Sequence, residues 1–89
     1  MRVREIIEIS KWLNGSGEQY NTIFSNKVVD LAADTQEEIK EFFDWDFWEK
    51  EELAENEDLK ITVEYFEVDA DTECDEPIAK LETWQSEIA

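Results

Sequence analysis

Residues 34–58 read DTQEEIKEFFDWDFWEKEELAENED, and this stretch sets the expectations for the fold of the whole chain. Twelve of its 25 residues are Asp or Glu, whereas only Lys40 and Lys50 are basic. Five aromatic residues lie among the acids: Phe42, Phe43, Trp45, Phe47 and Trp48. The sequence contains no motif that identifies a reaction. Its function therefore has to be inferred from this stretch and from the distribution of charge.

The stretch predicts a long amphipathic helix over residues 35–55. Asp34 and Thr35 are each followed three residues later by Glu, the spacing of a capping box, and acids in a first turn suit the helix dipole. At roughly 1.5 Å per residue the helix would be about 30 Å long. Aspartate and aromatic residues lower helix propensity at 44–48, so a break there is the alternative. The side expected to face the core comprises Ile39, Phe42, Phe43, Phe47 and Leu53.

The first 33 residues predict a helix followed by a hairpin. Apolar residues at helical spacing over 3–13 indicate a helix that stops at the Asn-Gly-Ser-Gly of residues 14–17. A strand over residues 5–10 is the alternative, because Ile-Ile-Glu-Ile also favours strands. Residues 18–24 and 27–32 are predicted as two strands that turn at 25–26, with a short helix over 27–33 as the alternative.

Residues 59–68 alternate apolar and polar side chains, which predicts a half-buried strand. After the acidic loop 69–76, residues 77–88 are predicted as a strand that pairs back on it, with a C-terminal helix as the alternative. The 89 residues suffice for one domain, residues 1–89. The predicted fold class is α+β: a small antiparallel sheet of three to four strands packed against two helices. A C-terminal helix would be a third.

The net charge of −17 is unevenly distributed along the chain. Residues 1–33 hold four acids and four bases, whereas residues 34–89 hold 21 acids and four bases. Such an excess attracts basic partners and repels nucleic acid and anionic membranes. We therefore expect a basic protein surface as partner, with no direct nucleic-acid binding and no membrane binding. No segment approaches the roughly 20 apolar residues of a membrane span, and no cleavable leader is apparent, which predicts a cytoplasmic protein.

Enzymatic chemistry lacks its usual groups in this sequence. There is no His and no Gly-rich phosphate loop, and neither Cys74 nor the serines have an evident base beside them. The loop 69–76 resembles a calcium loop only in its alternating acids. Its sixth position, where Gly is needed, is Cys74, and its twelfth, where Glu is needed, is Lys80. We expect a non-catalytic protein without metal or cofactor.

The charge also exceeds the magnitude of about 2 to 8 that keeps a small domain soluble. Trp45 and Trp48 fall on the charged side of the expected helix, and exposed Trp in a polar patch is typical of an interface hot spot. A merely solvated face is the alternative. We expect Trp48 to be the anchor. The candidate partner-binding residues are Glu37, Glu41, Asp44, Trp45, Trp48, Glu51, Glu52 and Glu55, extended by Asp69, Asp71, Glu73, Asp75 and Glu76.

Duplex DNA carries a negative charge about every 1.7 Å of its axis, and a row of carboxylates along a helix would offer similar anions to a DNA-binding groove. In its short length, acidity, Trp content and the acids of 34–58 and 67–76, the chain resembles the small DNA-mimic inhibitors carried by phages and other mobile elements, including anti-restriction and anti-CRISPR proteins. The resemblance is to a class. It implies a non-catalytic inhibitor of a defence nuclease, CRISPR effector or other DNA-binding protein, acting in the host cytoplasm if phage-encoded.

The alternative function is that of an immunity protein or antitoxin that neutralises a basic nuclease toxin. An acidic adaptor in a larger assembly is a third possibility. The sequence leaves the oligomeric state open.

Overall fold

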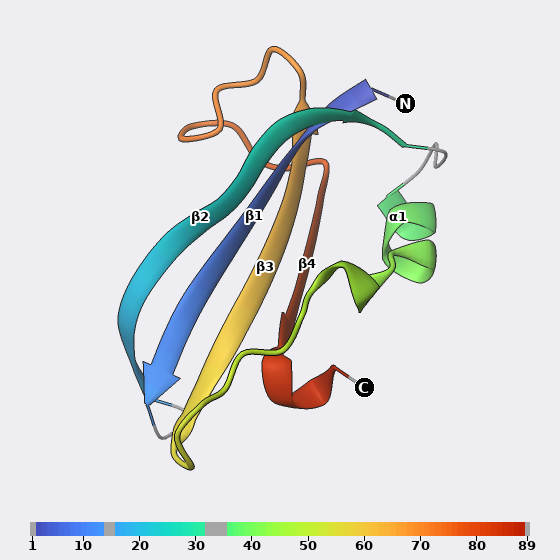
Figure 1. Cartoon of the computed structure of the whole chain (residues 1–89). Helices are drawn as coiled ribbons and strands as arrows, with labels where there is room; N and C mark the ends of the chain where they lie inside the picture. Colours follow the sequence, from blue (N-terminus) through green and yellow to red (C-terminus); the bar gives the residue numbers. More distant parts are fainter. Residues whose placement is uncertain (1, 14–15, 32–35, 89) are drawn as a thin grey trace.

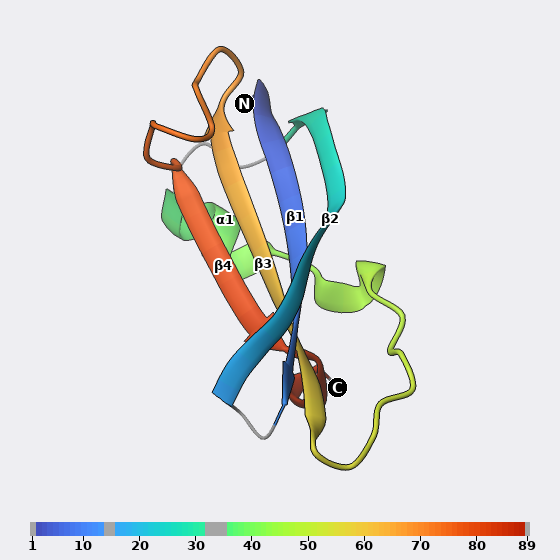
Figure 2. The same cartoon turned by 90° about the vertical axis from the view of Figure 1, so that its left-hand side faces the viewer.

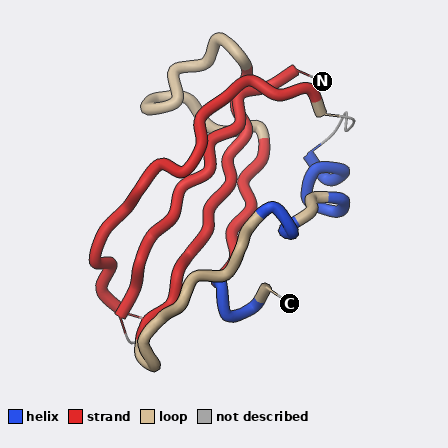
Figure 3. Tube along the Cα trace, in the orientation of Figure 1, coloured by secondary structure: helices blue, strands red, loops and turns tan. Residues whose placement is uncertain are grey.

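A four-stranded antiparallel sheet dominates the computed structural model, which describes residues 2–13, 16–31 and 36–88 (Figures 1 and 3). The strand order is β2-β1-β3-β4. The strands are β1 (Arg2–Leu13), β2 (Ser16–Asp30), β3 (Glu57–Glu67) and β4 (Ala79–Trp84). The helix α1 (Gln36–Phe42) and the 3₁₀ turns η1 (Trp45–Phe47) and η2 (Gln85–Glu87) lie on one face of the sheet (Figure 1). In the view of Figure 2, α1 lies behind the strands.

This architecture corrects the predicted fold class. Instead of a sheet packed against two or three helices, the described residues form a four-stranded sheet with one seven-residue α-helix and short 3₁₀ turns. The helix predicted over 3–13 is wrong, because these residues belong to β1. The alternative prediction, a strand over residues 5–10, is confirmed. Ile7 and Ile9 point to the core, whereas Ile6 is buried on the other face of the sheet. Burial on both faces removes the simple alternation that would have marked a strand.

The hairpin predicted to turn at 25–26 is also wrong, as is the short helix over 27–33 in its described part. β2 continues through this point, and Ser25 and Asn26 pair with Ile7 and Ile6 of β1. The register instead shifts by one residue at Phe24, which has no partner in β1 and forms a β-bulge. The hairpin is instead formed by β1 and β2, which pair antiparallel, and residues 14–15 between them lie outside the described part of the chain.

The helix predicted over 35–55 is wrong as well, and its first residue lies outside the described residues. α1 ends at Phe42, and residues 48–54 run without regular structure along the sheet to a turn at 55–56 (Figure 1). The helix breaks where aspartate and aromatic residues lower its propensity. Of the expected core residues, Ile39 is buried and Phe43 and Leu53 pack against the core, whereas Phe47 is 37% exposed. The side chain of Phe42 is outside the described set.

The strand predicted over 59–68 is confirmed as β3. The strand predicted over 77–88 is confirmed for β4, which pairs with β3, and the chain then turns into η2. Together these elements leave residues 36–56, called the covering segment below, lying over one face of the sheet (Figure 1).

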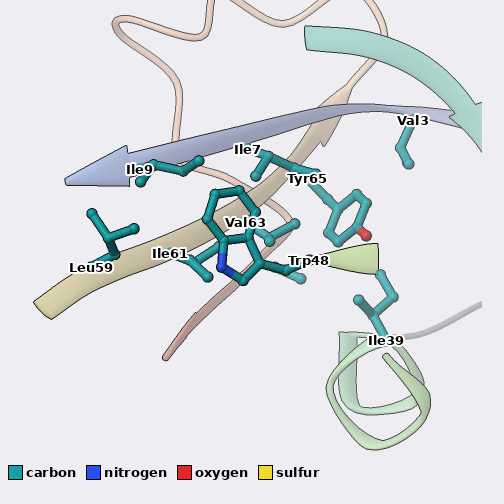
Figure 4. Packing of buried hydrophobic residues seen from close by; sticks show 10 residues of the cluster. Val3, Ile7, Ile9, Ile39, Trp48, Leu59, Ile61, Val63 and Tyr65 are labelled. Atoms are coloured by element: carbon teal, nitrogen blue, oxygen red, sulfur yellow. The ribbon is translucent and has the colours of Figure 1, made fainter. Parts of the chain in front are cut away.

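The core lies between the sheet and the covering segment, and β3 provides its centre. Leu59, Ile61, Val63 and Tyr65 are each at most 1% exposed, and Ile39 and Trp48 of the covering segment lie opposite them (Figure 4). These residues bury their apolar surface, the main stabilising contribution to such a fold. The Tyr65 hydroxyl donates a hydrogen bond to Glu5 Oε2 (2.7 Å), and burial together with this bond raises the pKa of Tyr65 far above its ordinary value.

An ion pair between Lys11 Nζ and Glu57 Oε2 (2.5 Å) joins β1 to the first residue of β3. The hydrogen bond from Lys11, and then the one from the Ala54 backbone N–H, lowers the pKa of Glu57 below its usual 4.5. The hydrogen bond to Glu57 raises the pKa of Lys11 above its usual 10.5. The pair therefore stabilises the fold at pH values between the lowered pKa of Glu57 and the raised pKa of Lys11. The stabilisation is lost as the pH falls through the pKa of Glu57, because the carboxylate is then protonated, and as the pH rises through the pKa of Lys11, because the ammonium group is then neutral.

We predict that Glu57→Gln destabilises the protein at neutral pH but not in acid. Urea denaturation at about pH 7 and about pH 3 measures both free energies of unfolding. The difference between variant and wild type should shrink as wild-type Glu57 becomes protonated. A difference that is equal at both pH values would show that the charge of Glu57 does not contribute.

Candidate partner-binding surface

A buried amide joins the covering segment to the sheet. Gln85, at the start of η2, is only 5% exposed. Its Oε1 accepts hydrogen bonds from Trp48 Nε1–H (3.1 Å) and the Glu51 backbone N–H (2.8 Å). Its Nε2 donates to the Glu51 carbonyl oxygen (2.9 Å). One side chain thus pairs both backbone groups of Glu51, as a neighbouring strand would, so this part of the covering segment needs no strand beside it.

Trp48 is not the exposed anchor that the sequence predicts. It is 8% exposed and belongs to the core (Figure 4). Its ring meets that of Phe24 edge-on, with 5.4 Å between the ring centroids. The end of α1 at Phe42 removes the helical phase that would have turned Trp48 outward. Trp45 is half-buried and packs edge-on against Phe43 at 4.8 Å. Both tryptophans therefore hold the covering segment on the sheet.

The acids predicted alongside these tryptophans do lie at the surface. Within the covering segment the exposed ones are Glu37, Glu41, Asp44, Glu51, Glu52 and Glu55. They do not form a row on one 30 Å helix, because α1 has only seven residues. Four of them, Asp44, Glu51, Glu52 and Glu55, come after α1, in the part of the chain that runs along the sheet to residues 55–56 (Figure 1). The covering segment contains nine acids and two bases in all, a net charge of −7.

The predicted loop residues Asp69, Asp71, Glu73, Asp75 and Glu76 are all exposed. Hydrogen bonds within the loop give it a defined shape: Asp71 Oδ1 accepts from the Glu73 N–H (3.0 Å), and Asp75 Oδ2 accepts from the Asp71 N–H (3.0 Å). The loop projects beyond the end of the sheet on the side away from α1 (Figure 1). It therefore forms a second acidic surface and does not extend the first. Over the described part of the chain no cluster of three or more His, Cys, Asp or Glu residues could hold a metal ion.

The face of the sheet opposite the covering segment is nearly balanced in charge. Residues that alternate with the core positions of each strand point to this face. Among the described side chains they include four bases and five acids: Arg2, Arg4, Lys60, Lys80, Glu8, Asp30, Asp58, Glu64 and Glu82. Lys60 Nζ pairs with Glu82 Oε2 (3.2 Å) and lies over the rings of Trp12 and Trp84, 5.8 and 5.9 Å from their centroids. The negative charge is thus concentrated on the covered side and on the loop.

Comparison of the chain with protein-family models, curated proteins and solved structures found no match. None of the described helices has the length and apolar character that spanning a membrane requires.

We predict that Gln85→Leu lowers the free energy of unfolding by about 2–3 kcal/mol, because it leaves the Trp48 indole and the backbone groups of Glu51 without their partner. Ser86→Ala is the control, since Ser86 is exposed and its hydroxyl bonds Asp58 Oδ2 (2.6 Å) at the surface. That change should cost less than about 1 kcal/mol. Urea denaturation measures both, and equal losses would contradict the role given to Gln85.

Proposed function

We propose that this protein is a non-catalytic inhibitor that binds the basic nucleic-acid-binding groove of a defence nuclease, CRISPR effector or other DNA-binding protein, and imitates the charge of nucleic acid. The observation that supports the proposal is the separation of charge in space. The covering segment carries a net charge of −7, and most of its acids are exposed, while the described side chains on the opposite face of the sheet are nearly balanced in charge. Solubility alone would not require charge to gather on one side.

Long-range attraction is the main contribution of such a surface. At physiological ionic strength charges act over about 8 Å, so carboxylates spread along one side of a small domain add their fields as a basic groove approaches. This raises the association rate more than it slows dissociation. The buried Trp48 cannot insert into the partner, so the proposal assigns the first encounter to the acids. Such targets act in the cytoplasm, and the protein would act there as well.

The alternative, an immunity protein or antitoxin against a basic nuclease toxin, is favoured by one specific feature. Tyr20 and Phe24 of β2 are 49% and 53% exposed, and Phe47 of the covering segment is 37% exposed. Exposed aromatic side chains suit a dedicated protein partner whose binding does not depend on imitating DNA. Competition with DNA separates the two functions.

We predict that a tagged form of the protein captures a nucleic-acid-binding protein from a lysate that contains nuclease effectors, and that excess duplex DNA prevents the capture. DNA and a mimic would occupy the same groove, and their competition follows from shared electrostatic contacts. A partner that stays bound in excess DNA would contradict mimicry and favour the immunity-type function.

The same complex tests where the charge acts. Glu41→Lys combined with Glu52→Lys should slow association about tenfold at low salt and weaken its salt dependence. Glu64→Lys combined with Glu82→Lys is the matched control, since it changes the net charge equally but on the opposite face. The control should associate at nearly the wild-type rate. Equal slowing in both double variants would show that net charge matters and its placement does not.

A further inference from the structure

A groove runs along the inner side of β2, between this strand and the covering segment. Its first hollow, of about 530 Å³, has walls that include Ile7, Leu31, Ile39, Phe43 and Tyr65. Its second hollow, of about 660 Å³, has walls that include Ile9, Tyr20, Thr22 and Trp48. Phe24 and Phe47 line both hollows, which are therefore neighbouring parts of one groove.

The exposed aromatic residues of the protein gather at this groove. The large apolar residues described as exposed are Tyr20, Ile23, Phe24 and Phe47, and all but Ile23 line it. The β-bulge explains the position of Phe24, because the extra residue turns this side chain to the covered face. There its ring lies 6.5 Å from that of Phe47. Exposed apolar side chains that gather in a concave site mark a binding surface.

The two sides of the groove differ in charge. On one side, residues 19–29 of β2 contain no acid and a single base, Lys27. On the other side, the covering segment lines the groove with four acids and one base: Glu38, Asp44, Glu49, Lys50 and Glu51. A segment that fills the groove therefore meets apolar rings beneath it and carboxylates along one side. Apolar side chains that alternate with Lys or Arg match this arrangement.

The groove also favours an extended segment. It follows β2 from Lys27 to Tyr20 and reaches Leu31 just beyond the strand, and β2 is an edge strand of the sheet, with only β1 beside it among the described strands. An extended chain matches a strand in length, about 3.3 Å per residue, and its side chains alternate in direction. A second copy of this protein fits less well, because it would bring a further net charge of −17 to the acidic side.

We propose that this groove binds an extended basic and apolar segment of a protein partner, with Phe24 and Phe47 in contact with its apolar side chains. The inference rests on the proposed function in one respect, since it describes how a basic partner would be recognised. It differs in its physical basis: the groove requires apolar side chains in the ligand, whereas the acidic surface requires only positive charge.

Two fluorescent peptides of about ten residues test the inference: an alternating Lys-Phe peptide and an alternating Lys-Ser peptide of equal charge. Fluorescence anisotropy should show that the Lys-Phe peptide binds the wild-type protein about tenfold more tightly, because only its side chains lose apolar surface to water in the groove. Phe24→Ala should remove most of this preference. Ile23→Ala should retain it, because Ile23 is the adjacent residue, is 57% exposed and lies on the opposite face, beside Glu8.

Each other outcome contradicts the groove. Equal binding of both peptides to the wild type would exclude an apolar contribution while leaving the acidic surface and the proposed function intact. Equal losses in Phe24→Ala and Ile23→Ala, or no loss in either, would place the apolar contact elsewhere. If neither peptide binds, the groove is excluded, and competition with duplex DNA still decides the proposed function separately. Because both side chains are exposed, neither substitution should unfold the protein, and urea denaturation verifies this.

Discussion

The hydrogen bonds of the buried Gln85 amide join an acidic, mostly irregular segment to a stable sheet. Residues 48–54 have no strand or helix of their own to pair their backbone groups. Gln85 supplies the partners for Glu51 and for the Trp48 indole, and it does so from 34 and 37 residues away in the sequence. With the segment in place, Ile61 and Val63 of β3 are fully buried. The position of the acids and one wall of the groove both depend on this attachment.

The mixed composition of the covering segment has a simple physical explanation. Its carboxylates repel one another, which disfavours a compact arrangement. Ile39, Phe43, Trp48 and Leu53, spaced along the segment, bury apolar surface against the sheet and offset that repulsion. The acids between them, such as Glu41 and Glu52, are left at the surface. The aromatic residues thus maintain the fold, and the carboxylates remain available to a partner.

Sequence patterns predicted those parts of the fold that depend on local order. Strict alternation from Leu59 to Tyr65 identified β3, whose core face is buried and whose other face is more polar. β1 was missed because Ile6 and Ile7 are both buried, on opposite faces, so the spacing of its apolar residues also fitted a helix.

The exposure of the acids was predictable from their charge. The burial of Trp48 was not, because it depends on an amide distant in the sequence, and a Gln at the end of a strand is ordinarily exposed. The groove was missed for a similar reason, since the bulge that turns Phe24 inward arises from pairing with β1.

Amide hydrogen exchange, followed by NMR, tests most directly whether the covering segment is fixed to the sheet by Gln85. The structure predicts that the Glu51 amide and the Trp48 indole exchange within about tenfold of the rate at Ile61, in the centre of the sheet. Exchange at both sites as fast as in the exposed loop 69–76 would contradict the attachment. In that case the acids would belong to a detached segment and the groove would lack one of its walls.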